Sequence, residues 1–285
     1  MIISVASGKG GTGKTTVSTS IAFSLTDKVQ FLDCDVEEPN AHIFIKPDIK
    51  KTEDVCILVP YVDESKCTFC GKCQKVCVYN CIAVLHSGDK DKGKILVFPE
   101  LCHGCGACSY LCPQKCITEV KRPVGVLEVG VKDHISFVHG KLYIGEAMAP
   151  PVIRAVKSKI DPEKIVIIDA PPGTSCPVIA SVNGSDFCIL VTEPTPFGLN
   201  DLVLAVEVLR KMKIPFGVVI NRADLGDKKT EEYCSREGIV ILMQIPFEKE
   251  IASSYSKGIP IVESFPHYKV QFRDLVLKIK NEIRR

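Results

Sequence analysis

The 285-residue chain has little net charge, no tryptophan and no long apolar run. Its formal net charge of +2 gives no reason to expect a nucleic-acid partner, because such partners are bound by clustered basic surfaces. No stretch approaches the roughly 18 consecutive apolar residues of a membrane-spanning helix. Strand-like residues begin already at Ile2, so we expect no cleavable signal segment. These absences predict a soluble, cytoplasmic protein. The length of 285 residues allows one large or two small domains.

Cysteine, in contrast, is abundant. The chain contains 15 cysteines, and ten of them lie between Cys67 and Cys116. Cytosolic thiols are kept reduced, and disulfide bonds are therefore rare in that compartment. The clustering thus predicts metal binding rather than disulfide bonding.

A glycine-rich segment near the N-terminus matches the complete phosphate-loop pattern G-x-x-x-x-G-K-[ST]. Its residues are Gly8, Lys9, Gly10, Gly11, Thr12, Gly13, Lys14, Thr15 and Thr16. The apolar run before it predicts a strand, and the apolar spacing after it predicts a helix. In such a loop backbone N–H groups and the lysine bind phosphate oxygens, and the threonine hydroxyl binds Mg²⁺. We therefore predict that Lys14 and Thr15 hold a nucleotide and its magnesium ion.

Short apolar strands alternate with amphipathic helices over most of the remaining chain. We expect strands at residues 29–32, 165–169, 187–191, 216–220 and 239–243. Apolar spacing predicts helices within residues 199–209 and 272–283. A hairpin is expected from residues 135–138 and 141–144, with His139 and Gly140 between them. The alternation predicts an α/β fold with a mostly parallel sheet and helices on both faces.

Aspartates follow two of the expected strands. Asp33 and Asp35 come at the end of the strand at 29–32, and Asp169 ends the strand at 165–169. Folds of this class place their chemistry at the carboxyl ends of parallel strands. These carboxylates are therefore candidates for the nucleotide site.

The clustered cysteines form an internal repeat with a constant offset of 35 residues. The two C-x₂-C-x₂-C-x₃-C runs are Cys67, Cys70, Cys73, Cys77 and Cys102, Cys105, Cys108, Cys112. This spacing is that of bacterial two-cluster ferredoxins, in which three thiolates of one run and the fourth of the other bind each cubane. The resemblance implies two [4Fe–4S] clusters, one on Cys67, Cys70, Cys73 and Cys112 and the other on Cys102, Cys105, Cys108 and Cys77.

Zinc is the alternative occupant, because paired C-x-x-C units also suit a tetrahedral ion. Two complete runs in tandem favour the iron–sulfur interpretation. Cys81 and Cys116 are surplus to both runs, and since each precedes an isoleucine we expect them to pack as buried side chains. We predict a small inserted α+β ferredoxin-like domain at residues 60–121, with residues 1–59 and 122–285 forming the phosphate-loop domain.

The phosphate loop carries a second lysine, Lys9, and so resembles the deviant Walker A motif of the MinD/ParA ATPases. That group includes the nitrogenase iron protein and the Mrp-type iron–sulfur carriers. Further segments that resemble the family are switch I at Asp33-Cys34-Asp35, Walker B and switch II at Asp169 to Thr174, the adenine-recognising pair Asn221 and Arg222, and the base-covering Pro246 and Phe247. With its cysteine insert, the chain resembles MinD-superfamily ATPases that contain a ferredoxin domain.

The resemblance assigns roles within the nucleotide site. It implies that Thr15 and Asp33 help to place Mg²⁺ and that Asp169 holds a water bound to the metal. Asp35 would orient the attacking water, and Gly173 would contact the γ-phosphate through its N–H. The implied ligand is ATP, hydrolysed slowly in the absence of a partner.

The resemblance also implies a homodimer in which Lys9 of one copy reaches the nucleotide of the other. There it would stabilise the charge that develops during phosphoryl transfer. The cysteines that bind the bridging cluster of the nitrogenase iron protein have no secure counterparts in this sequence. Cys176 and Cys188 are candidates, although a buried structural thiol is the favoured interpretation of each.

Three functions follow from combining a nucleotide switch with two clusters. The favoured one is ATP-dependent electron transfer to a redox partner protein. The alternative is ATP-dependent assembly or carriage of an iron–sulfur cluster for an apoprotein client. The third is a regulatory ATPase in which the clusters sense redox state.

Overall fold

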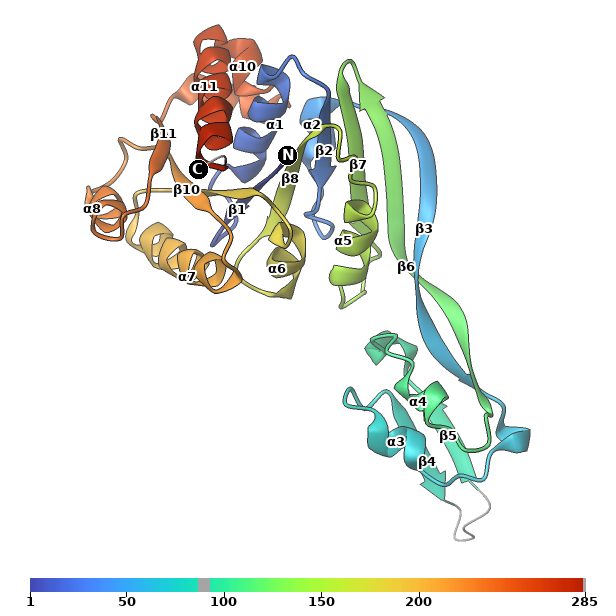
Figure 1. The fold of residues 1–285 in the computed structure, drawn as a ribbon. Coiled ribbons are helices and arrows are strands. Elements are labelled where there is room, and N and C mark those ends of the chain that lie inside the picture. Colours follow the sequence, from blue (N-terminus) through green and yellow to red (C-terminus); the bar gives the residue numbers. More distant parts are fainter. Residues whose placement is uncertain (87–92, 284–285) are drawn as a thin grey trace. The chain divides into compact units, whose positions relative to one another are not determined.

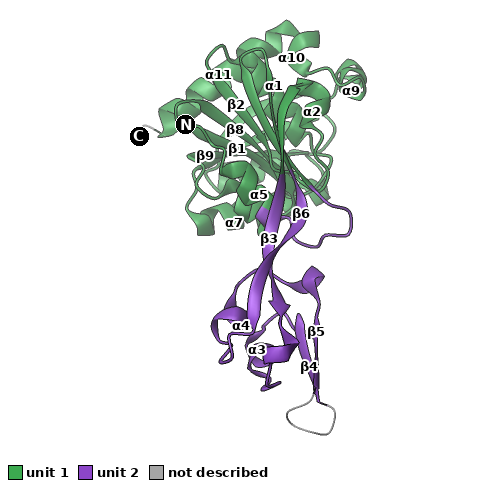
Figure 2. Cartoon of the chain, turned by 90° about the vertical axis from the view of Figure 1, so that its right-hand side faces the viewer, with its two compact units in different colours: residues 1–53, 127–141, 152–285 green, residues 54–126, 142–151 purple. Residues whose placement is uncertain are grey.

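The computed structural model describes residues 1–86 and 93–283, which form two compact units (Figures 1 and 2). Unit 1 consists of residues 1–53, 127–141 and 152–285, and unit 2 of residues 54–126 and 142–151. The predicted insert at 60–121 lies within unit 2. Unit 2 also includes residues 142–151, which are distant from the cysteines in sequence.

The described residues contain a nine-stranded sheet with the order β11-β10-β9-β1-β8-β2-β7-β6-β3. Neighbouring strands from β11 to β7 run parallel. These strands are β1 (Ile2–Ser7), β2 (Val29–Asp33), β7 (Ile135–Leu142), β8 (Ile165–Pro172), β9 (Phe187–Thr192), β10 (Phe216–Asn221) and β11 (Ile241–Ile245). The prediction of a mostly parallel sheet is confirmed.

Helices cover both faces of this part of the sheet (Figure 1). One apolar layer joins the strands to α1 (Lys14–Ser24), α2 (Ala41–Ile45), α10 (Ile261–Ser264) and α11 (Pro266–Ile283). The other joins them to α6 (Cys176–Val182), α7 (Pro196–Met212) and α8 (Lys229–Arg236). The remaining helices of unit 1 are α5 (Pro150–Lys157), whose first two residues belong to unit 2, and α9 (Lys249–Ser256). The strands are buried on both faces, as their continuous apolar runs predict.

The hairpin predicted at residues 135–144 is wrong. One unbroken strand, β7, runs through His139 and Gly140 and pairs in parallel with β2. Gly140 is needed there for close packing, because a Cβ atom would lie 2.5 Å from Cγ1 of Val152 in α5. The turn lies instead at Asp133, in the left-handed region at φ 50°, between β6 and β7. The strand predicted at 239–243 is observed two residues later, as β11.

Unit 2 contains short elements around the cysteines. They are α3 (Lys72–Val76), α4 (Ala107–Tyr110), the antiparallel pair β4 (Ile82–His86) and β5 (Gly93–Val97), and single 3-10 turns at Glu64–Lys66 and Pro99–Leu101. Two long strands, β3 (Asp48–Val62) and β6 (Ile117–Lys132), contain residues of both units. Residues 48–60 gave no clear prediction from sequence, and the structure places most of β3 there.

Candidate nucleotide site and thiol-lined cavities

The phosphate loop connects the end of β1 to the start of α1. Gly11 and Gly13 have φ values of 78° and 94°, which only glycine adopts without strain. A Cβ atom on Gly8 would lie 2.2 Å from the carbonyl oxygen of Asp201, so the loop passes too close to α7 for a side chain. The Ser7 hydroxyl closes the turn by donating to the carbonyl of Lys9 at 2.6 Å. The glycines of the motif therefore serve both turn geometry and close packing.

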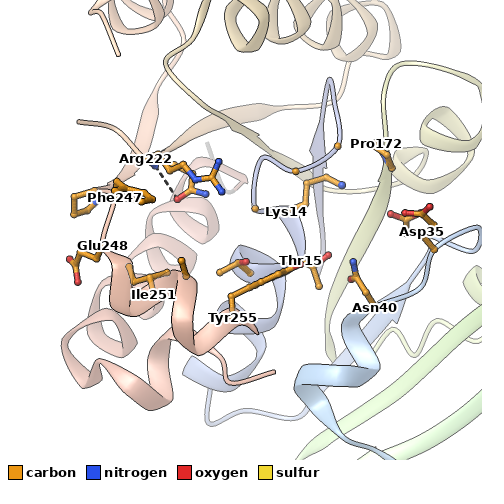
Figure 3. Close-up of a pocket in the computed structure, with 18 residues that line it drawn as sticks. Lys14, Thr15, Asp35, Asn40, Pro172, Arg222, Phe247, Glu248, Ile251 and Tyr255 are labelled. Atoms are coloured by element: carbon orange, nitrogen blue, oxygen red, sulfur yellow. Dashed lines mark hydrogen bonds between the residues drawn. The ribbon is translucent and has the colours of Figure 1, made fainter. Parts of the chain in front are cut away.

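A cavity of about 380 Å³ opens above this loop (Figure 3), within the usual size range of small-ligand sites. The predicted residues that line it are Gly10, Gly11, Gly13, Lys14, Thr15, Thr16, Asp35, Asn221, Arg222, Pro246 and Phe247. The other predicted residues lie around it without lining it: Gly8, Lys9, Thr12, Asp33, Asp169 and Gly173. The sequence thus located the cavity and most of its wall.

Three buried carboxylates lie at the ends of β2 and β8. Asp33 and Asp169 are register partners on these strands, and the Thr15 hydroxyl donates to Oδ2 of Asp169 at 2.7 Å. Burial raises the pKa of Asp33 well above its usual range, and the neighbouring Asp169 raises it further. Burial also raises the pKa values of Asp35 and Asp169 to about 6, although Lys14 opposes both shifts. Oδ1 of Asp169 is buried without a hydrogen-bond partner. This group of oxygen ligands has the donor chemistry that Mg²⁺ requires.

Asp33 and Gly173 use their polar groups in contacts within the protein. Oδ1 and Oδ2 of Asp33 accept from the backbone N–H groups of Asp35 and Ala41, both at 3.1 Å. The N–H of Gly173 donates to the carbonyl of Ser7 at 2.9 Å. In this structure Asp33 thus shapes the loop that carries Asp35. Gly173 ties the segment that follows β8 to Ser7, at the start of the phosphate loop. Their roles toward magnesium and the γ-phosphate stay predictions.

A further carboxylate, absent from the sequence predictions, links the phosphate loop to Arg222. Glu193 follows β9 and is 8% exposed. Its Oε1 lies 2.6 Å from Nη1 of Arg222, and its Oε2 lies 3.8 Å from Nζ of Lys9. Nearby, Nδ2 of Asn221 donates to the carbonyl of Thr12 at 2.9 Å. No motif marks Glu193, because only the fold brings it to these cations.

Helix α9 supplies a wall that sequence reasoning also missed. Ile251 and Tyr255 lie four residues apart and thus share one face of the helix toward the cavity (Figure 3). The Tyr255 ring packs on Phe44, with centroids 4.9 Å apart. Other lining residues outside the predicted set are Glu38, Asn40, Pro172, Glu248 and Ala252. The spacing of Ile251 and Tyr255 was the available signal, but in so short a helix it does not distinguish a ligand wall from core packing.

In unit 2, the cysteines line two smaller cavities. The Cys67 cavity contains Cys67, Cys70, Cys73, Cys112 and Cys116. The Cys102 cavity contains Cys77, Cys81, Cys102, Cys105 and Cys108. Apart from Cys81 and Cys116, these are the two groups of four that the ferredoxin spacing predicts. Cluster binding by these groups stays a prediction.

The 35-residue repeat is also present in the backbone of unit 2. Left-handed φ values occur at the matched pairs Phe69 and Gly104, Gly71 and Gly106, and Asn80 and Lys115. The N–H groups of Phe69 and Gly104 donate to the sulfurs of Cys67 and Cys102 at 3.3 and 3.4 Å. The two halves also exchange matched hydrogen bonds of 2.8 Å, Asp63 N–H to Cys116 O and Phe98 N–H to Cys81 O. Each half therefore builds the same local geometry around its cysteines.

Each surplus cysteine lies beside the fourth thiol of a run. The sulfur of Cys81 is 3.2 Å from that of Cys77, and the sulfur of Cys116 is 3.4 Å from that of Cys112. Both surplus cysteines are 3% exposed. Across residues 1–86 and 93–283, no three His, Cys, Asp or Glu side chains converge closely enough to hold a single metal ion. A cubane makes a different demand, since its four thiolates bind four separate iron atoms.

The two cysteines considered for a bridging cluster differ in their surroundings. Cys188 is fully buried in β9, and burial raises the pKa of its thiol to about 12. Cys176 is exposed at the start of α6. Cys188 thus has the surroundings of an inert core residue, whereas Cys176 is accessible.

Comparison with known sequences decides the family. The sequence profile of the CobQ/CobB/MinD/ParA nucleotide binding domain matches residues 3–261. The chain belongs to this family. Membership confirms the nucleotide-binding function predicted from the phosphate loop and supports ATPase activity.

Individual proteins similar in sequence to this chain are also found. Two uncharacterized proteins of Methanocaldococcus jannaschii are 33% and 32% identical to this chain. Each alignment covers 99% of this chain and 97% or 98% of the relative. An iron–sulfur cluster carrier protein of Pyrococcus horikoshii is 30% identical over 47% of this chain and 53% of its own length.

Solved structures of family members share the fold. The cell division ATPase MinD of Pyrococcus furiosus is 20% identical, with a TM-score of 0.57 and 98% of each chain covered. MinD of Pyrococcus horikoshii, solved with Mg-ADP, has the same identity and TM-score and covers 98% of this chain and 95% of its own. These likenesses show the α/β fold with its mostly parallel sheet.

None of the helices in the described ranges is long and apolar enough to cross a membrane.

Proposed function

We propose that this chain is an ATPase whose nucleotide-dependent dimerisation controls electron transfer through two [4Fe–4S] clusters. One observation carries the proposal. A nucleotide cavity of the MinD/ParA type and two cavities lined by matched sets of four cluster-type thiols belong to the same chain. A nucleotide switch and one-electron carriers in one polypeptide are the parts that a gated electron-transfer protein needs.

In the nucleotide half, Lys14 and the loop amides bind the β- and γ-phosphates of ATP. Thr15 and Oδ1 of Asp169 would hold Mg²⁺, directly or through water; the buried, unpartnered state of that oxygen supports this role. When bound, that ion would neutralise charge on the same phosphates. Asp35 lines the cavity and orients the water that attacks the γ-phosphorus. Arg222 and Phe247 contact the adenine base.

Lys9 completes the site of a second copy. Its side chain is only 32% exposed and is held 3.8 Å from Glu193, near the upper limit for an ion pair. A contact this loose costs little to exchange for the phosphates of a partner's nucleotide. We infer a nucleotide-sandwich homodimer in which Lys9 stabilises the transition state across the interface.

In the cysteine half, the donor set of each cavity fits a cubane. Each cavity presents three thiols of one run and the fourth of the other, and backbone N–H groups donate to sulfur in both. Such hydrogen bonds stabilise thiolates and tune the reduction potential of a cluster. The bound groups would store and pass single electrons to a redox partner protein.

A second candidate function is carriage of an iron–sulfur cluster to an apoprotein client. The similarity to iron–sulfur cluster carrier proteins supports it. So does the Pro171-Pro172-Gly173-Thr174 segment at the end of β8, which resembles that branch of the family. Against it, each cavity offers a full set of four thiols from one chain, which suits permanent centres. A redox-sensing regulatory ATPase shares these parts but delivers no electrons.

An anaerobic experiment separates these functions. Reconstituted protein is expected to contain about eight iron and eight sulfide per chain and to release phosphate from ATP. On addition of ATP-Mg²⁺, the reduced protein should pass electrons to an acceptor while its iron content stays constant. Transfer of iron and sulfide to an apoprotein would instead favour the carrier function. A chain that binds no cluster under these conditions would refute the proposal.

A further inference from the structure

The internal repeat of unit 2 provides a natural comparison between the two thiol-lined cavities. The thiols are matched in type, spacing and nearly in exposure, and an N–H group donates to the first sulfur of each run at 3.3 or 3.4 Å. Ligand type, hydrogen bonds to sulfur and solvent exposure all influence the potential of a cluster. Because these are matched, differences between the cavities arise mainly from the other side chains that line them.

Two of those differences change the charge. Residue 84 in the Cys67 cavity is a valine that is 9% exposed, whereas its repeat counterpart in the Cys102 cavity is Glu119. Residue 72 in the Cys67 cavity is a lysine, and its counterpart is Ala107. The Cys67 cavity therefore gains a cation and the Cys102 cavity an anion. At these two repeat positions the charges of the lining side chains differ by two units.

The carboxylate of Glu119 lies against the cysteine loop of its cavity. A Cβ atom on Gly106, next to Cys105, would lie only 3.3 Å from Oε1 of Glu119. At the matched Gly71 no atom lies within 4 Å of such a Cβ. Within the described residues Glu119 makes no hydrogen bond or ion pair that would neutralise it. Glu119 is solvent-exposed, and its charge lies beside the Cys102 cavity only.

We propose that the two cavities hold clusters of unequal reduction potential, with the Cys67 cavity the more easily reduced and with Glu119 and Lys72 setting the difference. The inference rests on the proposed function, since it requires a cluster in each cavity. Reduction adds one negative charge to a cluster, which a nearby cation favours and a nearby anion opposes. An electron that enters at the Cys102 cavity therefore passes to the Cys67 cavity and leaves the first cluster oxidised.

A second difference between the cavities concerns the rings over the Cys102 site. Tyr79 and His103 stack with centroids 3.5 Å apart and planes 7° apart, and both line that cavity. Their counterparts in the Cys67 cavity are Gln114 and Thr68. The stack gives the Cys102 site a flat aromatic cover that the other site lacks. The two clusters would therefore have different surroundings, which should make their spectra distinguishable.

The test is a reductive titration of the reconstituted full-length protein with dithionite at a fixed pH of 8, followed by electron paramagnetic resonance. Iron and sulfide are counted first. Wild type should reduce in two resolved one-electron steps. Glu119→Gln should raise only the lower potential, and Lys72→Ala should lower only the higher one. Each substitution should change the partition of the electron between the clusters by roughly three- to tenfold, or about 30–60 mV.

Two control variants remove the same kinds of charge at residues that line neither cavity. Glu100→Gln removes an exposed carboxylate, and Lys75→Ala removes a lysine of α3, and neither residue lines a cavity. Both controls should leave the two steps in place. Two full clusters that titrate together in wild type, or steps that the four variants move equally, would overturn the inference while sparing the proposed function. Absence of clusters at the iron count would overturn both.

Discussion

The nucleotide site is lined by residues from Gly10 to Tyr255, which meet near the carboxyl ends of buried parallel strands. In contrast, all cysteines of the thiol-lined cavities come from residues 67–116. The nucleotide site is held by two apolar layers made up almost entirely of side chains from the strands and helices of unit 1. In unit 2, buried residues of the cysteine repeat include Cys73, Cys81, Cys102, Cys108 and Cys116 themselves. Unit 1 should therefore be ordered before it binds, while unit 2 should depend on what its cysteines bind.

The largest effect is expected from the second lysine of the phosphate loop. Lys9→Ala should reduce ATP hydrolysis by roughly 10³-fold, because a trans-acting cation at the transferred phosphoryl group contributes at least that much. Nucleotide affinity and iron content should stay unchanged, since Lys9 lines neither the nucleotide cavity nor the thiol-lined cavities. Phosphate release measures the rate of hydrolysis, and equilibrium binding measures the nucleotide affinity. Unchanged turnover would contradict the homodimer.

Removal of the other lysine should weaken binding itself. Lys14→Ala should raise the dissociation constant for ATP about 10- to 100-fold, the value of a charge-assisted contact to phosphate. Isothermal calorimetry measures it, and Lys211→Ala in α7, away from the cavity, is the matched control for both lysine variants. Iron and sulfide content should match wild type, because unit 1 has its own apolar layers and the cluster-type thiols all lie in unit 2. Loss of clusters in the Lys14 variant would show that unit 2 does not assemble independently of the nucleotide site.

The third prediction concerns unit 2. Cys112→Ala should remove one cluster and thus about half of the iron, because this thiol belongs to the Cys67 cavity despite its place in the second run. Cys116→Ala, whose sulfur lies 3.4 Å away, is the control and should keep the full iron content. Hydrogen exchange should rise in unit 2 of the Cys112 variant and stay unchanged in unit 1. Equal iron in the two variants would refute the crossed ligand sets.

The fold and the site were predictable from sequence to different extents. The phosphate loop was found because glycine, lysine and threonine at fixed spacing are needed locally by one chemistry. The grouping of Cys112 with Cys67 was expected from the resemblance to two-cluster ferredoxins, and the structure places both in the Cys67 cavity. Glu193 was missed because nothing in its own neighbourhood marks it. The α9 wall was missed because the spacing of Ile251 and Tyr255 fits core packing equally well. His139 and Gly140 were misassigned to a turn because the glycine serves packing against Val152, a contact that only the tertiary fold creates.

A smaller effect is expected on the pH dependence of stability, from the buried Asp35 carboxyl group. Burial raises the pKa of Asp35 to about 6, whereas an unfolded aspartate titrates near 4. Between about pH 4 and 6 the folded, nucleotide-free protein therefore binds more protons at this residue than the unfolded chain. Its contribution to stability is present at low pH and is lost as the pH rises through this window. Relative to Asp35→Asn, wild type should lose on the order of 1–3 kcal/mol between pH 4 and pH 7.

Urea denaturation of both proteins at each pH, without nucleotide, measures this difference. Comparing the two proteins cancels the titration of all other groups that the substitution leaves unchanged. Stability curves that run parallel from pH 4 to pH 7 would show that Asp35 ionises normally. The buried charge at the nucleotide site would then need another explanation.

The central claim is that the nucleotide site controls the clusters. Its most direct test is to measure the cluster reduction potentials, and the rate of electron transfer to an acceptor, with and without ATP-Mg²⁺ under anaerobic conditions. We expect ATP-Mg²⁺ to shift at least one potential or accelerate transfer in wild type, and neither change to occur in Lys14→Ala. Identical potentials and identical rates in wild type with and without ATP-Mg²⁺ would contradict it.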